Sequence, residues 1–342
     1  MIARTQHSVE GESLQNQPLS WQEELSRAIR RPRELLEALH LPADLLDGME
    51  QADQLFALRV PRPYLSRIEP GNPRDPLLLQ VLPSLQETRQ VPGYLTDPLQ
   101  EQQAIPHPGI LHKYHGRVLL IASGACAVNC RYCFRRHFPY GDNTLSTQEW
   151  EQALGYIADN PSIDEVILSG GDPLAVNDKR LNWLIARLET IPHVQRLRIH
   201  TRLPIVIPQR ITPELLDTLQ RSRLQKVMVI HANHARELDE AVHQALRKLH
   251  SVGVTLLNQA VLLRNVNDDA DTLAELSKQL FTSGALPYYL HLLDPVQGAA
   301  HFDVPETEAV ALVKSLLELL PGYLVPKLVR EEPGRPSKSP IL

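Results

Sequence analysis

The sequence predicts an α/β fold built as an open, partial (β/α)6 barrel. From residue 117 onward, short apolar runs rich in β-branched residues alternate with amphipathic segments. This alternation is typical of βαβ units and a parallel sheet. Only six strand candidates occur, which is too few for a closed eight-stranded barrel. We therefore expect a partial barrel, preceded by an N-terminal helical region and followed by a C-terminal tail.

The N-terminal third predicts short helices and loops that cover one side of the barrel. Residues 1–19 are polar, and we expect them to be disordered. Ser20 followed by Glu23 forms a capping box, which marks the start of a helix. Prolines punctuate the chain from there to residue 108, which favours rigid connections. Residues 20–108 are therefore expected to wrap the core.

The predicted core occupies residues 109–320, and the tail occupies residues 321–342. Apolar runs predict strands at Val118–Ala122, Glu165–Ser169, Leu197–His200, Lys226–Ile230, Val254–Gln259 and Tyr288–Leu292. Helical periodicity predicts helices that include Leu181–Leu188, Pro213–Gln220, Glu237–Leu249 and Thr272–Phe281. In parallel α/β folds, ligands bind at the carboxyl ends of the strands. We therefore expect the site in the loops that follow the strands.

The composition indicates a protein that binds neither nucleic acid nor membrane. The formal net charge is −5, which gives no general affinity for nucleic acid. Apolar stretches are interrupted, as by Lys314, and none is long enough to span a bilayer. The N-terminal segment carries no apolar signal sequence. We therefore expect a cytoplasmic location, where thiols stay reduced.

The three cysteines of the chain all lie in one loop after the first predicted strand. They are Cys126, Cys130 and Cys133, in the pattern C-x3-C-x2-C. Three thiolates can hold three irons of a [4Fe–4S] cluster and leave the fourth iron open to a substrate. This spacing is that of the radical S-adenosylmethionine (SAM) enzymes, and the chain resembles that superfamily from here onward.

Three thiols so close together have two other common uses. A disulfide plus one free thiol would suit an oxidising compartment, which the N-terminal segment does not indicate. A zinc ion could take the three thiolates with His137. Zinc sites usually come as two separated pairs of ligands, and the sequence has no second pair. The open iron–sulfur cluster is the preferred interpretation.

A second polar loop follows the second predicted strand, as Ser169-Gly170-Gly171-Asp172-Pro173. The glycines would let the backbone approach a ligand and expose N–H groups to an anion, and Asp172 could accept from an ammonium group. An ordinary Gly-Asp-Pro turn is the alternative. In radical SAM enzymes the corresponding element contacts the amino-acid portion of SAM, so the resemblance implies that role here.

Polar residues also follow the later strands. His231 follows the fourth strand, and Asn258 with Gln259 ends the fifth. Each could merely cap a loop, but the carboxyl ends of parallel strands meet at one mouth. We therefore expect these residues to line a ligand cavity, as candidates for contact with cofactors.

A longer set of motifs resembles the lysine 2,3-aminomutase family. The resemblance covers residues from about 55 to the C-terminus and is closest to the branch that makes (R)-β-lysine for modifying elongation factor P. It rests on His112-Lys113-Tyr114, Arg117, the cysteine loop, Arg135-Arg136, the Gly-Gly-Asp loop, the stretch 258–268 and Pro287-Tyr288-Tyr289.

The resemblance implies pyridoxal 5′-phosphate (PLP) as a further cofactor. PLP requires a lysine for its Schiff base, and the matching position is Lys338 in the tail. The family has a run of glycines before that lysine, where this chain has Gly334-Arg335-Pro336-Ser337. The resemblance further implies that Arg117 binds the PLP phosphate and that Tyr114 lines the PLP pocket.

The resemblance also assigns a binding residue to each end of free L-lysine. Arg135 matches the position that clamps the α-carboxylate, and guanidinium suits bidentate carboxylate binding. Asp294 matches a carboxylate that meets the ε-ammonium. Glu331 aligns where the family typically has aspartate, so its longer side chain would change the depth of that contact.

The implied function is conversion of (S)-α-lysine to (R)-β-lysine by a 5′-deoxyadenosyl radical and a PLP aldimine. The implied partners are elongation factor P, its lysyl ligase and a reductant such as flavodoxin or ferredoxin. Three alternatives stay open: a radical SAM aminomutase for glutamate or arginine, a non-catalytic iron–sulfur or zinc scaffold that binds the translation factor, and an activase that installs a glycyl radical on a partner.

Overall fold

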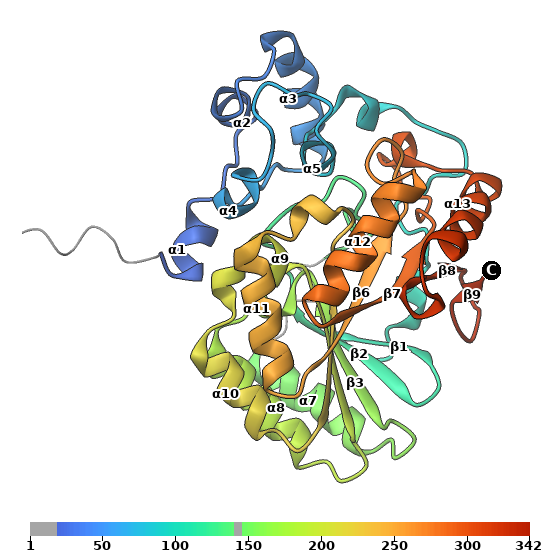
Figure 1. The fold of residues 1–342 in the computed structure, drawn as a ribbon. Helices are drawn as coiled ribbons and strands as arrows, with labels where there is room; N and C mark the ends of the chain where they lie inside the picture. The colour runs from blue at the N-terminus through green and yellow to red at the C-terminus, as the bar shows by residue number, and fades with distance from the viewer. Residues whose placement is uncertain (1–18, 140–145) are drawn as a thin grey trace, which may run out of the picture.

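The structure is a computed structural model that describes residues 19–139 and 146–342. It contains one nine-stranded sheet whose strands lie side by side in chain order (Figure 1). The strands are β1 (Ile110–Tyr114), β2 (Arg117–Ser123), β3 (Glu165–Gly170), β4 (Arg196–Thr201), β5 (Gln225–Ile230), β6 (Thr255–Val261), β7 (Ala285–His291), β8 (Lys327–Arg330) and β9 (Ser339–Pro340). The expected N-terminal disorder lies, as far as residue 18, outside the described residues.

The sheet is parallel in its middle and antiparallel at its two edges. Strands β2 to β8 pair in parallel, while β1 pairs antiparallel with β2 and β9 with β8. The open α/β partial barrel expected from the sequence is confirmed, with β8 as a seventh parallel strand. That strand has only four residues, two of them charged, and lies in the expected tail, so its pattern is too short to read.

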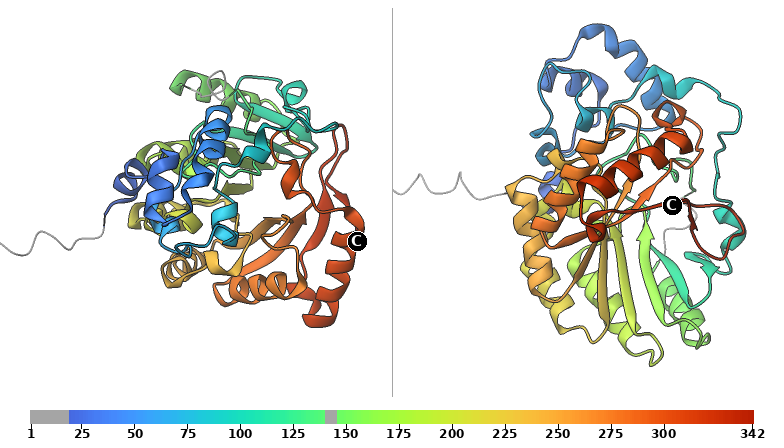
Figure 2. Two further views of the ribbon diagram at one scale, coloured as in Figure 1. Left: turned by 90° about the horizontal axis from the view of Figure 1, so that it is seen from above. Right: turned by 45° about the vertical axis from the view of Figure 1, so that its right-hand side comes forward.

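Helices cover the outer face of the sheet and one end of the barrel (Figures 1 and 2). The N-terminal helices α1 and α4 pack against segments near α9, and α11 and α12 pack on β6 and β7. The helices are α1 (Trp21–Ser26), α2 (Pro32–Ala38), α3 (Leu46–Leu55), α4 (Arg62–Leu65), α5 (Pro76–Leu79), α7 (Thr147–Ala158), α8 (Asp178–Glu189), α9 (Leu203–Val206), α10 (Pro213–Arg221), α11 (Glu240–Ser251), α12 (Ala270–Thr282) and α13 (Glu306–Leu319).

Local sequence signals account for most of these boundaries. The Ser20 capping box begins α1, and Ser146 with Glu149 forms a second one at α7. Thr212 caps α10, whose first residue is Pro213. All six residues of β3 are buried, because helices cover one side of the sheet and the barrel interior covers the other. The sheet and its helices therefore form a rigid support for the loops at the strand ends.

Within the described residues, no helix is both long and apolar enough to cross a membrane.

Candidate active site

A cavity of about 540 Å³ opens where the predicted ligand loops meet. Its lining comes from the N-terminal region, from β1 to β4, β6 and β7, from the loops that follow β2, β3, β5 and β7, and from the C-terminal tail. Fifteen residues that the sequence singled out line it: Tyr114, Arg117, Cys126, Cys130, Cys133, Arg135, Ser169, Gly170, Gly171, Asp172, His231, Gln259, Asp294, Glu331 and Lys338.

Several buried polar atoms of the lining lack a protein partner. Arg202 Nε and the Nε2 atoms of His200, His231 and His291 have no hydrogen-bond partner among the described residues. Buried polar atoms are normally paired, so such atoms mark places where a ligand or water completes the bonding. Burial and, next, the charge of Arg202 lower the pKa of His231 to about 4, so its imidazole is neutral near pH 7.

Asn258 does not reach the cavity, which corrects its expected role in cofactor binding. Its amide is buried, and it accepts from Ala232 N at 2.9 Å and donates to Ala232 O at 3.0 Å. This side chain therefore ties β6 to the end of β5. Its neighbour Gln259 lines the cavity, because successive strand residues point to opposite faces.

The three cysteine side chains lie together at the cavity and form no disulfide. Burial and the neighbouring Cys133 raise the pKa of Cys126, and burial and Cys130 raise the pKa of Cys133 to about 11. These thiols would ionise when a metal cation supplies the compensating charge. The donor set of three closely placed thiols thus fits a [4Fe–4S] cluster.

The zinc alternative is not supported by the geometry. Zinc would need a fourth protein ligand beside the three thiols. His137, the suggested fourth zinc ligand, has Nε2 3.2 Å from Gln297 O and is absent from the cavity lining.

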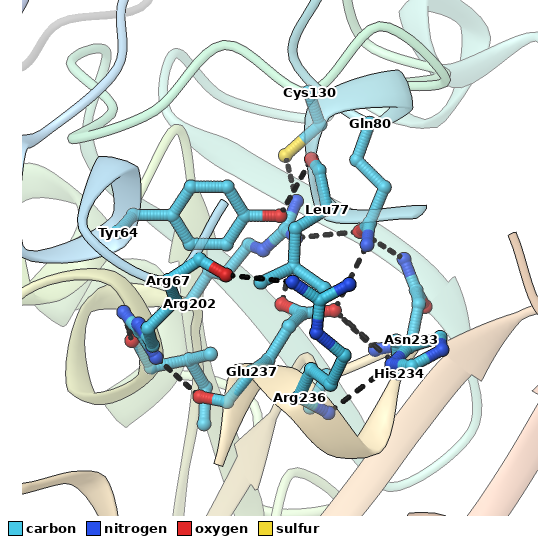
Figure 3. A network of polar contacts seen from close by, with 12 residues as sticks. Tyr64, Arg67, Leu77, Gln80, Cys130, Arg202, Asn233, His234, Arg236 and Glu237 are labelled. Carbon is cyan, nitrogen blue, oxygen red and sulfur yellow. Dashed lines mark hydrogen bonds and ion pairs between the residues drawn. The ribbon is translucent and has the colours of Figure 1, made fainter. Parts of the chain in front are cut away.

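Cys130 contacts a buried polar network that sequence reasoning missed (Figure 3). Arg202 Nη1 donates to Cys130 Sγ and to Tyr132 Oη, both at 2.7 Å. Arg202 Nη2 donates to Gln80 Oε1 at 2.7 Å and to Glu237 Oε2 at 2.9 Å. We call Arg202, Glu237, Gln80, Tyr132 and Asn233 the Arg202 network.

The Arg202 network joins the N-terminal region to the barrel behind the cysteine loop. Asn233 donates to Gln80 Oε1 at 3.0 Å and to Tyr132 Oη at 2.7 Å. Glu237 Oε1 accepts from Gln80 at 3.1 Å and from the Asn233 N–H at 2.9 Å. Burial opposes the ionisation of Glu237, but Arg202 and these hydrogen bonds outweigh it and lower its pKa.

The Gly-Gly-Asp loop binds the cysteine loop, which corrects part of its expected role. A Cβ on Gly171 would lie 2.6 Å from Ala125 O, so only glycine allows this close approach. The Gly171 N–H donates to Ser123 O at 2.7 Å and the Asp172 N–H to Ala125 O at 2.8 Å. These two N–H groups therefore hold the two loops together and do not form the exposed anion site that we expected.

Asp172 is likewise used within the protein. Its Oδ1 accepts from Leu174 N at 3.0 Å and Thr201 Oγ1 at 2.7 Å, and its Oδ2 from Arg202 N at 2.8 Å and Leu203 N at 3.0 Å. Each carboxylate oxygen already accepts two hydrogen bonds from the protein. This geometry does not favour the bond from a ligand ammonium group that we expected. The carboxylate instead positions the segment that carries Arg202.

A second group of polar side chains lies beside the C-terminal tail. Glu331 Oε2 accepts from Lys338 Nζ at 2.6 Å, and its Oε1 accepts from Tyr114 Oη at 3.1 Å and Lys113 Nζ at 3.4 Å. Burial opposes the ionisation of Glu331, but Lys338 and Lys113 outweigh it and lower its pKa. These contacts bridge β1 at one edge of the sheet to the β8–β9 hairpin at the other.

Arg135 is held by a glutamate that no motif indicated. Its Nε and Nη2 donate to the two carboxylate oxygens of Glu101 at 2.7 and 2.8 Å, and its Nη1 donates to Ser169 Oγ at 3.2 Å. Glu101 also accepts from Lys113 Nζ at 3.1 Å. We call Glu331, Glu101, Lys113, Tyr114, Arg135 and Lys338 the Glu331 cluster.

Two further charged residues face the cavity near this cluster. The Arg117 guanidinium stacks on the Tyr114 ring at 4.6 Å and has no carboxylate within 4.0 Å in the described parts of the chain. Asp294 is half-buried, and this burial together with the nearby Glu331 raises its pKa to about 7. The cavity therefore offers two charged groups to a ligand. Arg117 is a cation suited to a phosphate, and Asp294 is a carboxyl group that a bound cation would ionise.

The fold and the three thiols at the end of its first parallel strand define a radical SAM enzyme. The family model of the Radical SAM superfamily matches residues 120–276. The chain belongs to the L-lysine 2,3-aminomutase family of radical SAM enzymes, as its relatives show. It is thus a radical SAM isomerase of the lysine 2,3-aminomutase type, with a [4Fe–4S] cluster and SAM as cofactors.

The relatives share most of their length with this chain. The L-lysine 2,3-aminomutase of Escherichia coli (strain K12) is 57% identical over 94% of this chain and 94% of the relative. The L-lysine 2,3-aminomutase of Haemophilus influenzae is 56% identical over 94% of this chain and 95% of the relative. The L-lysine 2,3-aminomutase of Clostridium subterminale is 36% identical over 94% of this chain and 77% of the relative. The solved structure of a radical SAM methyltransferase from Sphaerobacter thermophilus aligns over 65% of this chain and 68% of the methyltransferase chain. The TM-score is 0.45 and the sequence identity is 16%.

Proposed function

We propose that this chain converts (S)-α-lysine into (R)-β-lysine, with PLP as its third cofactor. One observation supports the choice of lysine most directly. Glu331 binds a primary alkylammonium group, that of Lys338, at 2.6 Å, with Asp294 as a second carboxylate in the same cavity. Arg135 supplies a guanidinium for the other end of the substrate. A free diamino acid matches this distribution of charge.

The residues of the cavity divide the binding tasks. Cys126, Cys130 and Cys133 would hold the cluster, and Lys338 would hold PLP with its phosphate at Arg117. When bound, the cluster and SAM supply a carbon-centred radical, and PLP supplies a conjugated π-system through which the amino nitrogen migrates. The protein binds the lysine carboxylate at Arg135, binds its ε-ammonium at Asp294 and Glu331, and excludes water from the reacting atoms.

The surrounding residues support this division. Ser169 and Gln259 line the same cavity between the cysteine loop and the Glu331 cluster, as contacts for SAM or PLP. The Arg117 guanidinium lies over the Tyr114 ring, which favours this position of the cation. The product would serve the cytoplasmic modification of elongation factor P, through the ligase that attaches it.

An anaerobic turnover assay tests the proposal. The iron-reconstituted protein is incubated with SAM, PLP, a strong reductant and ¹³C-labelled L-lysine, and the products are identified by NMR. We expect β-lysine, and we expect none from Cys130→Ala or Lys338→Ala. Reductive cleavage of SAM without β-lysine would reject lysine as the substrate, and parallel reactions with glutamate and arginine would then identify another amino acid.

The biological destination needs a separate test. Adding elongation factor P and its lysyl ligase to the assay should yield the β-lysylated factor, detected by the mass of the intact protein. If free β-lysine accumulates while the factor stays unmodified, the proposed role in translation is wrong and the aminomutase activity stands.

A further inference from the structure

Glu101 is a buried acidic residue that neither the cysteine loop nor the strand-end motifs account for. It lies in the short 3-10 helix Glu101–Ala104, in the segment before β1. Its exposed fraction is 4%, and its own N–H donates to Asp97 Oδ1 at 3.0 Å. The backbone therefore fixes the place from which its carboxylate reaches into the cavity.

The carboxylate of Glu101 fixes the plane of the Arg135 guanidinium. The two parallel bonds, at 2.7 and 2.8 Å, form a bidentate pair along one edge of Arg135. The bond from Arg135 Nη1 to Ser169, at 3.2 Å, holds a second edge. Arg135 is thus oriented by the segment before β1 and by the end of β3, which leaves it little rotational freedom.

Glu101 also holds Lys113 next to Arg135. Its Oε1 accepts from both cations, from Arg135 at 2.8 Å and from Lys113 at 3.1 Å. Burial opposes the ionisation of Glu101, but Arg135 and Lys113 outweigh it and lower its pKa, so the carboxylate is charged near pH 7. Without that charge, two cations would face each other in a site of low polarity.

Two roles are chemically consistent with this geometry, and they predict opposite results. Glu101 could compete with the carboxylate of the substrate for Arg135, or it could position Arg135 for that carboxylate. Competition would require Glu101 to withdraw from Arg135 and Lys113 together, and to move a residue that Asp97 anchors. Removing one member of a buried ion pair is strongly unfavourable, so the geometry favours positioning.

We propose that Glu101 is a positioning residue for substrate binding: it orients Arg135 toward the α-carboxylate of lysine and keeps Lys113 beside it. This inference rests on the proposed function. It adds a residue that does not contact the substrate but acts through one that does, and it places part of the specificity for an α-carboxylate in the N-terminal segment.

The test compares Glu101→Gln with the wild-type enzyme, both loaded with cluster, SAM and PLP. We expect the KM for lysine to rise on the order of tenfold, because a misoriented guanidinium binds the carboxylate poorly. We expect kcat to stay within about threefold, since the reacting atoms do not touch Glu101. Equilibrium dialysis of ¹⁴C-lysine against the unreduced enzyme should show the same loss of affinity without turnover.

L-Lysinamide, which lacks the carboxylate, makes the readout specific. The wild-type enzyme should prefer lysine to lysinamide in dialysis, and Glu101→Gln should lose most of that preference. Glu101→Asp, which keeps the charge, should restore part of the affinity and provides the test if Glu101→Gln is insoluble. In the Arg135→Lys background, Glu101→Gln should cause little further loss, because both changes remove one interaction.

Asp178→Asn is the matched control. Asp178 pairs with the buried Arg210 at 2.7 Å, and neither residue lines the cavity, so lysine affinity should not change. The inference would be overturned if Glu101→Gln bound lysine as tightly as the wild type or more tightly. It would also be overturned if the losses of lysine affinity from Glu101→Gln and Arg135→Lys were additive in the double variant. If the wild-type enzyme itself neither binds nor converts lysine, the proposed function fails instead, which the wild-type arm reports separately.

Discussion

The Arg202 network and the Glu331 cluster are both built from buried charges, yet they differ in how completely those charges are enclosed. The Arg202 and Glu237 side chains are 5% and 0% exposed, and every polar atom of Glu237 that faces the network has a donor. In the Glu331 cluster, Lys338 and Glu331 are 21% and 16% exposed. The cavity beside that cluster also holds Asp294, whose carboxyl is protonated or charged depending on pH.

This difference separates a network that is enclosed and paired mostly within the protein from a more exposed cluster beside the C-terminal tail. A matched, enclosed network resists change because each removal leaves a buried group unpaired. The Lys338–Glu331 pair is more exposed, so it can exchange partners at lower cost. We therefore expect substitutions in the Arg202 network to act on stability, and substitutions in the Glu331 cluster to act on activity.

Lys338→Ala should produce the largest effect, and it should fall on activity alone. Production of β-lysine is expected to drop by at least about 10⁴-fold, equivalent to about 5.5 kcal/mol of activation free energy. The free energy of unfolding should change by less than about 1 kcal/mol, since Glu331 keeps Lys113 and Tyr114 as partners. NMR of the products and urea unfolding measure the two quantities. Substantial residual turnover would remove Lys338 from the proposed mechanism.

Arg202→Met should have the opposite pattern, with a large loss of stability. It leaves Glu237 buried without its cation, which costs about 3–5 kcal/mol of unfolding free energy. Urea unfolding of the purified protein measures this loss. The double variant Arg202→Met with Glu237→Gln should recover part of it, because no uncompensated charge is left. Equal instability of the single and double variants would contradict the ion-pair explanation.

Asp294→Asn should stabilise the protein at neutral pH while weakening lysine binding. The pKa of Asp294 is about 7 in the fold and about 4 in an unfolded chain. Between these values the unfolded chain releases the proton that the folded protein keeps, so wild-type stability falls as pH rises. The Asp294→Asn variant lacks this dependence of stability on pH.

At pH 8 the free energy of unfolding of the variant should therefore exceed that of the wild type by about 1–2 kcal/mol. This range is reduced to account for partial solvent screening. Below about pH 3 the advantage should vanish, because both states of the wild type are then protonated. Urea unfolding between pH 4 and pH 8 measures the slope. A wild-type slope of the opposite sign would show that Asp294 is ionised in the unliganded cavity.

Arg187→Ala provides the baseline, with the smallest effect. Arg187 pairs with Glu151 at 2.7 Å, and the two side chains are 47% and 44% exposed. Exposed ion pairs contribute about 0–1 kcal/mol, so neither stability nor activity should change beyond that range. A larger loss in thermal or urea unfolding would mean that exposed pairs contribute more here than their solvent exposure suggests.

The sequence predicted the elements and residues whose signals are local. Strands β2 to β7 follow apolar runs, and the spacing of Cys126, Cys130 and Cys133 needs only eight consecutive residues. The Arg202 network was missed because Gln80, Asn233 and Glu237 come from distant segments, with Gln80 and Glu237 separated by 157 positions. Glu101 was missed for the same reason, since its partner Arg135 lies 34 positions away.

Residue type alone also misled at two positions. Asn258 and Asp172 occupy strand ends, where ligands usually bind, and both carry suitable side chains. In the fold, each is turned to backbone or hydroxyl groups of its neighbours. The pattern shows that a polar group stands at a strand end, but the path of the next loop determines whether a ligand or the protein itself binds it.

The bridge from Lys113 and Tyr114 to Glu331 means that side chains, not a backbone ladder, close the circle of this barrel. Side-chain bonds between edge strands break at far lower cost than a continuous sheet. Hydrogen exchange should therefore be fastest for the amides of β1, β8 and β9 and slowest for those of β3 to β6. The two edges of the sheet are therefore the part of the barrel that opens at the lowest cost while the rest stays folded.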